Sequence, residues 1–375
     1  MPSRCSRGHG SAKNLSTIEG NPKVSNIVSI GLPRRPNKAQ RQAGLLQSFA
    51  VHRRSRDDVY WLKENAEALN VMATSGARMP DHALAVYQPF YDTIEDRIRF
   101  FPQYYRFLLS ICLDLEDLGI HGRKGAALCQ WVRASDLAAS ELSDLQRAEA
   151  ERLLTRRLDL PIDTALRERL LAFASHSQTF ALPNKKAAYE LTHILFYLSD
   201  YGQKPVDVSD DIVTSLEFAG LLAYLDQDVD LLAEVCTALR FAGQRPSQIW
   251  EDMLAAENGG VSIQSAPDGA QSDAYHEYLV TSWWAEIAGV EGFCALPVQG
   301  GMEITRQRQT MGPLRLISEM LYHLGSARSA DWHHMRSILD NNLEAHQSRI
   351  LNGAAQSTDR FDQLFAQFSR VPVCK

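Results

Sequence analysis

A narrow stripe of polar and aromatic residues marks one predicted helix. Pro183 and Asn184 suit its first turn, and Gly202 followed by Lys204-Pro205 ends it. At 100° per residue, a histidine, a carboxylate, two phenols and a phenyl ring fall on one face. The stripe consists of Tyr189, His193, Phe196, Tyr197 and Asp200. An ordinary core helix carries Leu or Ile at such positions, so the stripe favours the wall of a polar pocket.

The histidine and the carboxylate of this stripe are the residues that can do chemistry. His193 can serve as a general base with Asp200 as an orienting carboxylate, or both can ligate a metal. Seven residues span ~10.5 Å along a helix, so a substrate or water between the two is expected rather than direct contact. The alternative is structural: His193 bonds a backbone carbonyl in the core, and Asp200 caps the next element.

A second polar-aromatic face lies on the predicted helix at 272–288. His276 and Trp283 are seven residues apart, Asp273 lies one turn earlier, and Tyr275 is adjacent. If this helix faces the first one, the two predict a pocket between 183–202 and 272–288. The predicted catalytic residues are His193, Asp200 and His276, and the predicted substrate-binding residues are Tyr189, Tyr197, Asp273, Tyr275 and Trp283. The alternative for Tyr275 and His276 is hydrogen-bonded packing.

Metal and cofactor signatures are weak in this sequence. Histidines and carboxylates suit a divalent ion, but no spacing such as HExxH supports one, so no metal ligand is predicted and the cofactor is unknown. Asp226, Asp228 and Asp230 have calcium-loop spacing without the Gly and Glu of such a loop, and a helix follows at once. These three acids are therefore interpreted as a helix cap and first turn.

The charge distribution divides the chain. Residues 1–56 contain eleven Lys and Arg against the single acid Glu19, whereas the remainder has 28 basic and 44 acidic residues. An acidic folded part argues against a nucleic-acid groove across it. The sequence has no apolar run of ~18 residues, so no membrane span is predicted. It also has no apolar segment near the N-terminus, so no secretory signal is predicted. The six cysteines are scattered and form no CxxC pair. Because neither a membrane span nor a secretory signal is predicted, a cytoplasmic location is expected.

Hydrophobic periodicity predicts an all-α fold with more than a dozen helices from Asp57 onward. The only segment that suggests a strand is 298–304. Short Gly, Pro or Asp breaks favour antiparallel helical hairpins, assembled as a large irregular helical domain or an α/α toroid. Two regions are expected: a disordered basic tail over 1–56 and a single helical domain over 57–375.

The stretch FALPNKKAAYELTH at 180–193, with FYLSDYG at 196–202, resembles an uncharacterised, chiefly alphaproteobacterial family of all-helical proteins known only as a domain of unknown function. The segments at 216–226, 230–234 and 275–278 are also similar to that family. The resemblance covers most of 57–350. It implies a bacterial cytosolic protein and brings no activity.

Together these patterns predict a small-molecule enzyme or ligand-binding protein. The alternative is a non-catalytic helical adaptor whose acidic face binds a basic protein partner. No membrane partner is expected, and the sequence does not indicate an oligomeric state.

Overall fold

The computed structural model describes residues 35–267, 273–306 and 311–371. Within these residues the chain forms nineteen α-helices, three short 3₁₀-helices and one two-stranded antiparallel hairpin. The prediction of an all-α fold is therefore confirmed. Everything described below belongs to one compact unit, 36–375.

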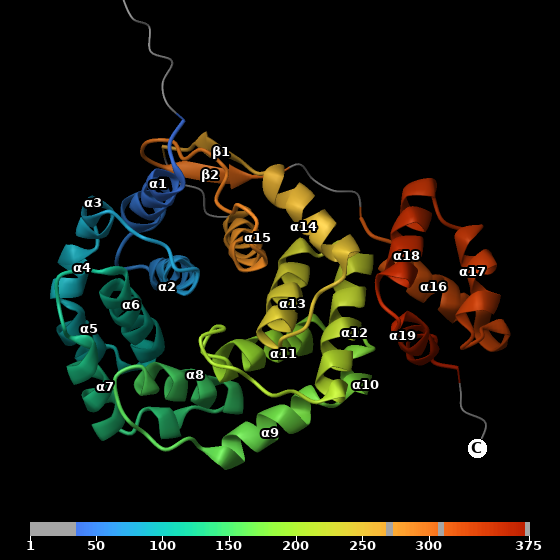
Figure 1. Ribbon diagram of the computed structural model, residues 1–375, viewed down its shortest axis with the longest axis horizontal. Coiled ribbons are helices and arrows are strands. Elements are labelled where there is room, and N and C mark those ends of the chain that lie inside the picture. The colour runs from blue at the N-terminus through green and yellow to red at the C-terminus, as the bar shows by residue number, and fades with distance from the viewer. Residues whose placement is uncertain (1–34, 268–272, 307–310, 372–375) are drawn as a thin grey trace, which may run out of the picture. The chain divides into compact units, whose positions relative to one another are not determined.

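Six helices contact one another in a closed ring (Figure 1). In chain order they are α2 (Val59–Thr74), α6 (Tyr105–Leu118), α8 (Asp144–Thr155), α11 (Lys185–Leu198), α13 (Val229–Phe241) and α15 (Tyr275–Ala288). Each contacts the next, and α15 returns to contact α2. The first and last inner helices thus close the ring, although more than 200 residues separate them.

A second set of helices packs against the inner ring. It comprises α1 (Lys38–Val51), α3 (Asp81–Ala85), α4 (Gln88–Asp92), α5 (Ile94–Phe100), α7 (Gly125–Ala134), α9 (Thr164–Ala174), α10 (Ser177–Phe180), α12 (Asp210–Asp226) and α14 (Gln248–Gly259). Helix α1 packs on α2, α7 on α6 and α8, α9 on α8 and α11, and α14 on α13 and α15. Inner helices with outer partners form an α/α toroid, one of the two predicted architectures.

Side-chain caps explain where several inner helices begin. Asp58, Ser143, Asn184 and Asp228 each accept a hydrogen bond from a backbone N–H in the first turn of the helix that follows. Such caps satisfy donors that have no partner within the helix. Asp228 therefore has the capping role expected from its sequence context.

The two strands form a small hairpin beside α15. Strand β1 (Ser262–Ser265) pairs with β2 (Met302–Thr305), with Ser262 opposite Thr305 and Ser265 opposite Met302. The suggested strand at 298–304 is thus found, shifted towards its end. Its partner β1 was not predicted, because three of its four residues are exposed and the segment lacks a strong hydrophobic pattern.

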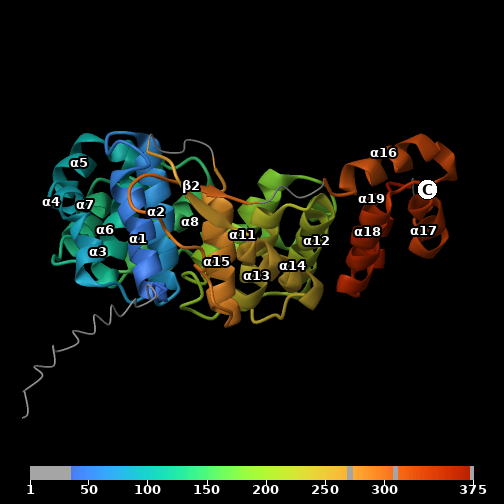
Figure 2. The same cartoon turned by 90° about the horizontal axis from the view of Figure 1, so that it is seen from above.

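Four C-terminal helices lie outside the ring (Figure 2): three of them pack against α12, and the fourth, α17, packs against α19. They are α16 (Leu314–Leu324), α17 (Trp332–Asp340), α18 (Ala345–Ser357) and α19 (Phe361–Phe368). Trp332 packs edge-on against Phe361 and Phe365, with ring centroids 5.0 and 5.2 Å apart. These C-terminal helices therefore have their own aromatic contacts and are not part of the inner ring.

The predicted disordered tail over 1–56 is too long at its C-terminal end. Residues 38–51 form helix α1, which buries Leu45, Leu46 and Phe49 against the toroid. Basic composition hid these three apolar residues, which lie on one helical face. Residues 1–34 lie outside the described part of the chain.

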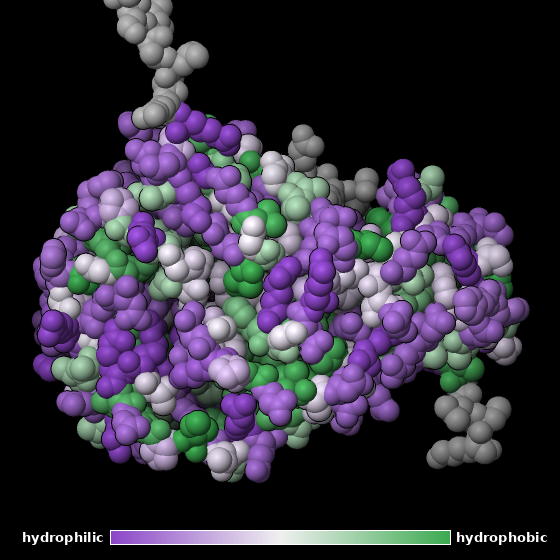
Figure 3. Space-filling view, viewed as in Figure 1, coloured by the Kyte–Doolittle hydropathy of each residue, from purple (hydrophilic) through white to green (hydrophobic). Residues whose placement is uncertain are grey.

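The surface view agrees with a core held between the two helical layers. On the face drawn in Figure 3, hydrophilic residues predominate and hydrophobic ones form smaller separate areas. None of the helices in the described ranges is both long and apolar enough to cross a membrane.

Candidate functional site

A cavity of about 220 Å³ is lined by side chains from all six inner helices. Its wall combines acids, bases and aromatic rings. The titratable or charged members are Glu67, Arg106, Glu149, Arg152, His193, Glu234 and His276. A smaller groove of about 40 Å³ near Phe180 is mainly apolar, and its Lys185 already pairs with two aspartates. The cavity within the ring is therefore the candidate site.

His276, in the first turn of α15, forms a close pair with Asp230 in the first turn of α13. Its Nδ1 lies 2.6 Å from Asp230 Oδ1. Burial by itself would lower the pKa of His276, but the hydrogen bond and negative charge of Asp230 outweigh it and raise the pKa to about 9. His276 is therefore an imidazolium at neutral pH.

Both partners of this pair are held by further hydrogen bonds. The Tyr189 hydroxyl donates to Asp230 Oδ2 at 2.7 Å. On the other side, His276 Nε2 lies 3.9 Å from Glu67 Oε1, and the Tyr275 hydroxyl donates to Glu67 Oε2 at 3.1 Å. Burial raises the pKa of Asp230, yet its bonds to His276 and Tyr189 bring it below the ordinary value. The pair is thus fixed as carboxylate and imidazolium.

His193, on α11, differs from His276 in its hydrogen bonding. Its Nδ1 lies 2.7 Å from the Tyr189 carbonyl oxygen, and a carbonyl can only accept, so Nδ1 carries a proton. In the neutral ring, Nε2 then has a lone pair, and within the described residues no partner bonds to it. The side chain is 33% exposed. His193 can therefore accept a proton from a molecule in the cavity.

Glu234, on α13, is buried beside His193. The Thr192 hydroxyl donates to its Oε2 at 2.6 Å, and that oxygen lies 3.6 Å from His193 Nδ1. Burial raises the pKa of Glu234 above its ordinary value. The cavity thus contains a carboxyl group that holds its proton more strongly than a surface carboxyl does.

The remaining wall is aromatic and carries Arg152 of α8. The guanidinium carbon lies 4.6 Å from the ring centre of Tyr201, and Tyr201 lies 5.6 Å from Trp283. Phe196 packs against both rings, at 5.7 and 5.0 Å. A cation on an aromatic wall can bind an anionic or planar group.

The structure brings four predicted site residues to the cavity: His193, His276, Tyr197 and Trp283. Tyr189 lies behind the wall and positions Asp230. Asp200 has a left-handed backbone at φ 49° beyond the end of α11, and bonds Arg152 at 3.3 Å and Lys204 at 3.1 Å. Neither Tyr189 nor Asp200 lines the cavity, so their predicted roles would be indirect.

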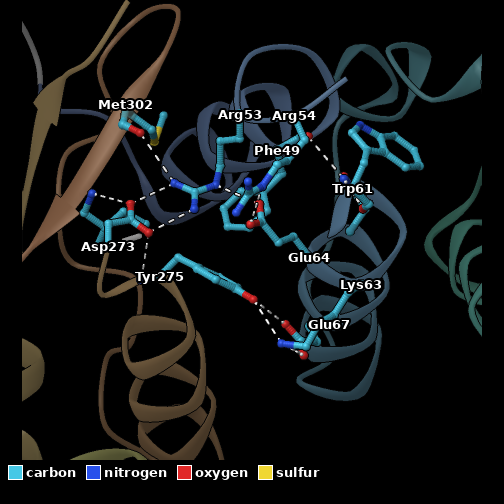
Figure 4. A network of polar contacts seen from close by, with 12 residues as sticks. Phe49, Arg53, Arg54, Trp61, Lys63, Glu64, Glu67, Asp273, Tyr275 and Met302 are labelled. Atoms are coloured by element: carbon cyan, nitrogen blue, oxygen red, sulfur yellow. Dashed lines mark hydrogen bonds and ion pairs between the residues drawn. The ribbon is translucent and has the colours of Figure 1, made fainter. Parts of the chain in front are cut away.

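Asp273 and Tyr275 do not line the cavity; Figure 4 shows both of them beside Arg53. Both Asp273 oxygens bond the Arg53 guanidinium, at 2.8 and 2.9 Å, and Arg53 Nε bonds Glu64 at 3.0 Å. We call Arg53, Glu64 and Asp273 the clasp. The side chains of Arg53 and Asp273 are 0% exposed, so Asp273 is out of reach of a cavity ligand. The Tyr275 ring packs on Arg53, 5.0 Å from the guanidinium carbon.

Several wall residues were not found by sequence reasoning. They are Glu67, Arg106, Glu149, Arg152 and Glu234, with Asp230 behind them. One signal was available: Glu234 interrupts an otherwise apolar run, Leu231 to Cys236, and an acid there must be buried or must face a polar cavity. The others lie on helices with ordinary charged patterns, which do not identify an inward side chain.

Metal ligation finds no support in the arrangement of side chains. Among residues 35–267, 273–306 and 311–371, no three His, Cys, Asp or Glu side chains are grouped to hold a metal ion.

The comparisons with known proteins give no activity, since no curated protein and no solved structure matches the chain. A family model described as a domain of unknown function (DUF6902) matches residues 24–371, and the chain belongs to that family.

Proposed function

We propose that the protein is an enzyme that performs acid–base chemistry on a small molecule held in the ring cavity. One observation carries the proposal: two histidines in different hydrogen-bonding states line the same cavity, on α11 and α15. His193 offers a lone pair on Nε2, and His276 offers a proton. Environments that separate two titratable groups in this way are typical of acid and base partners.

In the proposed reaction His193 takes a proton from the substrate and His276 donates one. Asp230 keeps His276 oriented and charged, and Tyr189 fixes Asp230. Each proton transfer of this kind contributes roughly 10²–10⁴-fold to a rate. The resemblance to a bacterial family and the finding of no membrane-crossing helix in the described ranges support a bacterial, cytoplasmic setting as part of the same proposal.

The test uses the full chain and a small-molecule extract of bacterial cells. Compounds retained by the purified protein are identified by mass spectrometry, and their conversion is followed over time. The wild type is expected to retain and convert a compound. His193→Gln and His276→Gln are expected to slow conversion at least ~100-fold while both variants remain folded, since Gln preserves a hydrogen-bonding side chain.

His333→Gln is the matched control, because this histidine lies on α17 and its side chain is 81% exposed. It is expected to behave as wild type. The proposal is wrong if the wild type retains no small molecule, or if both cavity variants convert the retained compound at the wild-type rate. Retention of a protein partner alone would favour the adaptor alternative.

A further inference from the structure

Three wall residues of the cavity carry N–H donors that find no acceptor among residues 35–267, 273–306 and 311–371. They are Asn70 Nδ2 on α2, Arg152 Nε on α8 and Trp283 Nε1 on α15. These residues are only 7, 6 and 2% exposed. A buried donor without a partner costs about 1–3 kcal/mol. Such an arrangement persists where something outside the protein, a ligand or water, supplies the missing acceptor.

The acids of the same wall are already paired. Glu149 bonds Arg106, Glu67 bonds Lys63 and Tyr275, and Glu234 bonds Thr192. The wall therefore has few acceptors waiting for a donor, whereas it has donors waiting for acceptors. An occupant matched to this wall brings oxygen atoms rather than N–H groups.

The charge near Arg152 is positive, which also favours an occupant that brings oxygen atoms. Asp200 is shared by two cations, Arg152 at 3.3 Å and Lys204 at 3.1 Å. One carboxylate between two cations gives these three residues a net positive charge. By contrast, the guanidinium of Arg53 bonds two carboxylates at 2.8–3.0 Å. Arg152 thus has free capacity to bind an anion, and a guanidinium pairs readily with a carboxylate.

Aromatic rings surround this cationic end. Trp283, Phe196 and Tyr201 form one cluster with ring centroids 5.0–5.7 Å apart. Such a surface favours an apolar, planar body beside the charged group. Arg152 Nε and Trp283 Nε1 are two donors in this cluster, and each can bond a carboxylate oxygen.

We propose that the cavity takes a small organic carboxylate with an apolar, planar body, its oxygens against Arg152 and Trp283. The inference rests on the proposed function and names its substrate class. Glu67 and Glu149 line the same cavity, and their negative charges oppose a dianion. A monoanionic carboxylate therefore fits better than a phosphate monoester.

The experiment measures binding of four fluorinated probes to the full chain by ¹⁹F NMR. They are 4-fluorobenzoate, the neutral 4-fluorobenzamide, the cationic 4-fluorobenzylamine and the dianionic 4-fluorophenyl phosphate. The benzoate is expected to bind at least ~10-fold more tightly than each of the other three, because only it provides two acceptors and a single negative charge.

Two adjacent tryptophans on α15 supply a matched pair of variants. Trp283→Phe removes an unpartnered N–H at the cavity and is expected to weaken benzoate binding about 5-fold. Trp284→Phe removes an equally buried indole whose Nε1 donates to Glu251 at 3.2 Å and does not line the cavity. It is expected to change binding less than 2-fold. Arg152→Met is expected to weaken binding at least ~10-fold.

Each of the other outcomes rejects a different part of the proposal. Equal binding of benzoate and benzamide, or equal effects of the two tryptophan variants, rejects the carboxylate site while a small-molecule cavity remains. Tighter binding of the phosphate or the amine rejects the charge assignment. If none of the four probes binds at millimolar concentration, the carboxylate site is rejected, whereas the proposed function is rejected only if the protein also retains no small molecule from the extract.

Discussion

Two charged clusters share helices α2 and α15 but differ in how completely their polar atoms are paired. The clasp uses Glu64 and Asp273, and the cavity uses Glu67 and His276, three residues further along each segment. In the clasp every Arg53 nitrogen bonds a carboxylate and the Arg53 and Asp273 side chains are sealed from water. In the cavity His193 and His276 are about a third exposed and three donors lack acceptors.

This difference favours a structural role for the clasp and supports the proposed binding role of the cavity. A buried ion pair with all its bonds made leaves nothing for a ligand, and the clasp joins the two helices that close the ring. A cluster with unmet bonds next to open volume costs stability and is ready to bind. Tyr275 lies between them, packed on Arg53 and bonded to Glu67 (Figure 4).

The largest expected effect is on the clasp. Arg53→Met leaves Asp273 buried without its cation and leaves Glu64 paired with Arg54 alone, which is expected to cost about 3–5 kcal/mol of unfolding free energy. Chemical denaturation measures the loss. Arg315→Met, at an arginine whose side chain is 79% exposed, is the control and is expected to stay within about 0.5 kcal/mol of wild type. An equally small loss for Arg53→Met would mean that the clasp does not hold the ring.

Two asparagines on α2 give the next test. Asn65 is fully bonded: its Nδ2 donates to Phe49 O and Trp61 O, and its Oδ1 accepts from the Tyr87 hydroxyl. Asn65→Leu is therefore expected to cost about 2 kcal/mol, and Asn70→Leu, which removes an unpartnered donor, to be neutral or stabilising within about 1 kcal/mol. Thermal unfolding of both variants measures these losses. Equal losses would show that unpartnered donors do not distinguish the cavity from the rest of the core.

The smallest effect is the pH dependence of the His276–Asp230 pair. Since folding raises the pKa of His276 from 6.5 to about 9, its stabilisation is fully present below pH 6.5 and is lost as pH rises through 9. The shift corresponds to roughly 3 kcal/mol, and solvent screening of a side chain that is 32% exposed reduces the expected value to about 1–2 kcal/mol.

The measurement for this pair is the difference in unfolding free energy between wild type and His276→Gln at pH 6 and pH 10. The difference is expected to shrink at pH 10, because the wild-type histidine has then lost its charge. A difference that is constant with pH would mean that folding does not raise the pKa of His276, and the proposed acid role would be lost.

Much of the local structure was predictable from sequence. Asn184, Asp228 and Ser143 cap helices because their short side chains bond nearby backbone N–H groups. The inward positions of His193, Tyr197, His276 and Trp283 followed from helical periodicity. These features depend on residues a few positions apart, which a sequence displays directly.

Only the tertiary structure decided which groups meet. Asp230 pairs with His276 across 46 residues and Asp273 with Arg53 across 220. Asp273 and His276 lie one turn apart, yet one is sealed in the clasp and the other faces the cavity. Sequence by itself therefore determined the helices and their polar faces. Closure of the ring determined the partners, because burial and pairing depend on which distant helix packs opposite each face.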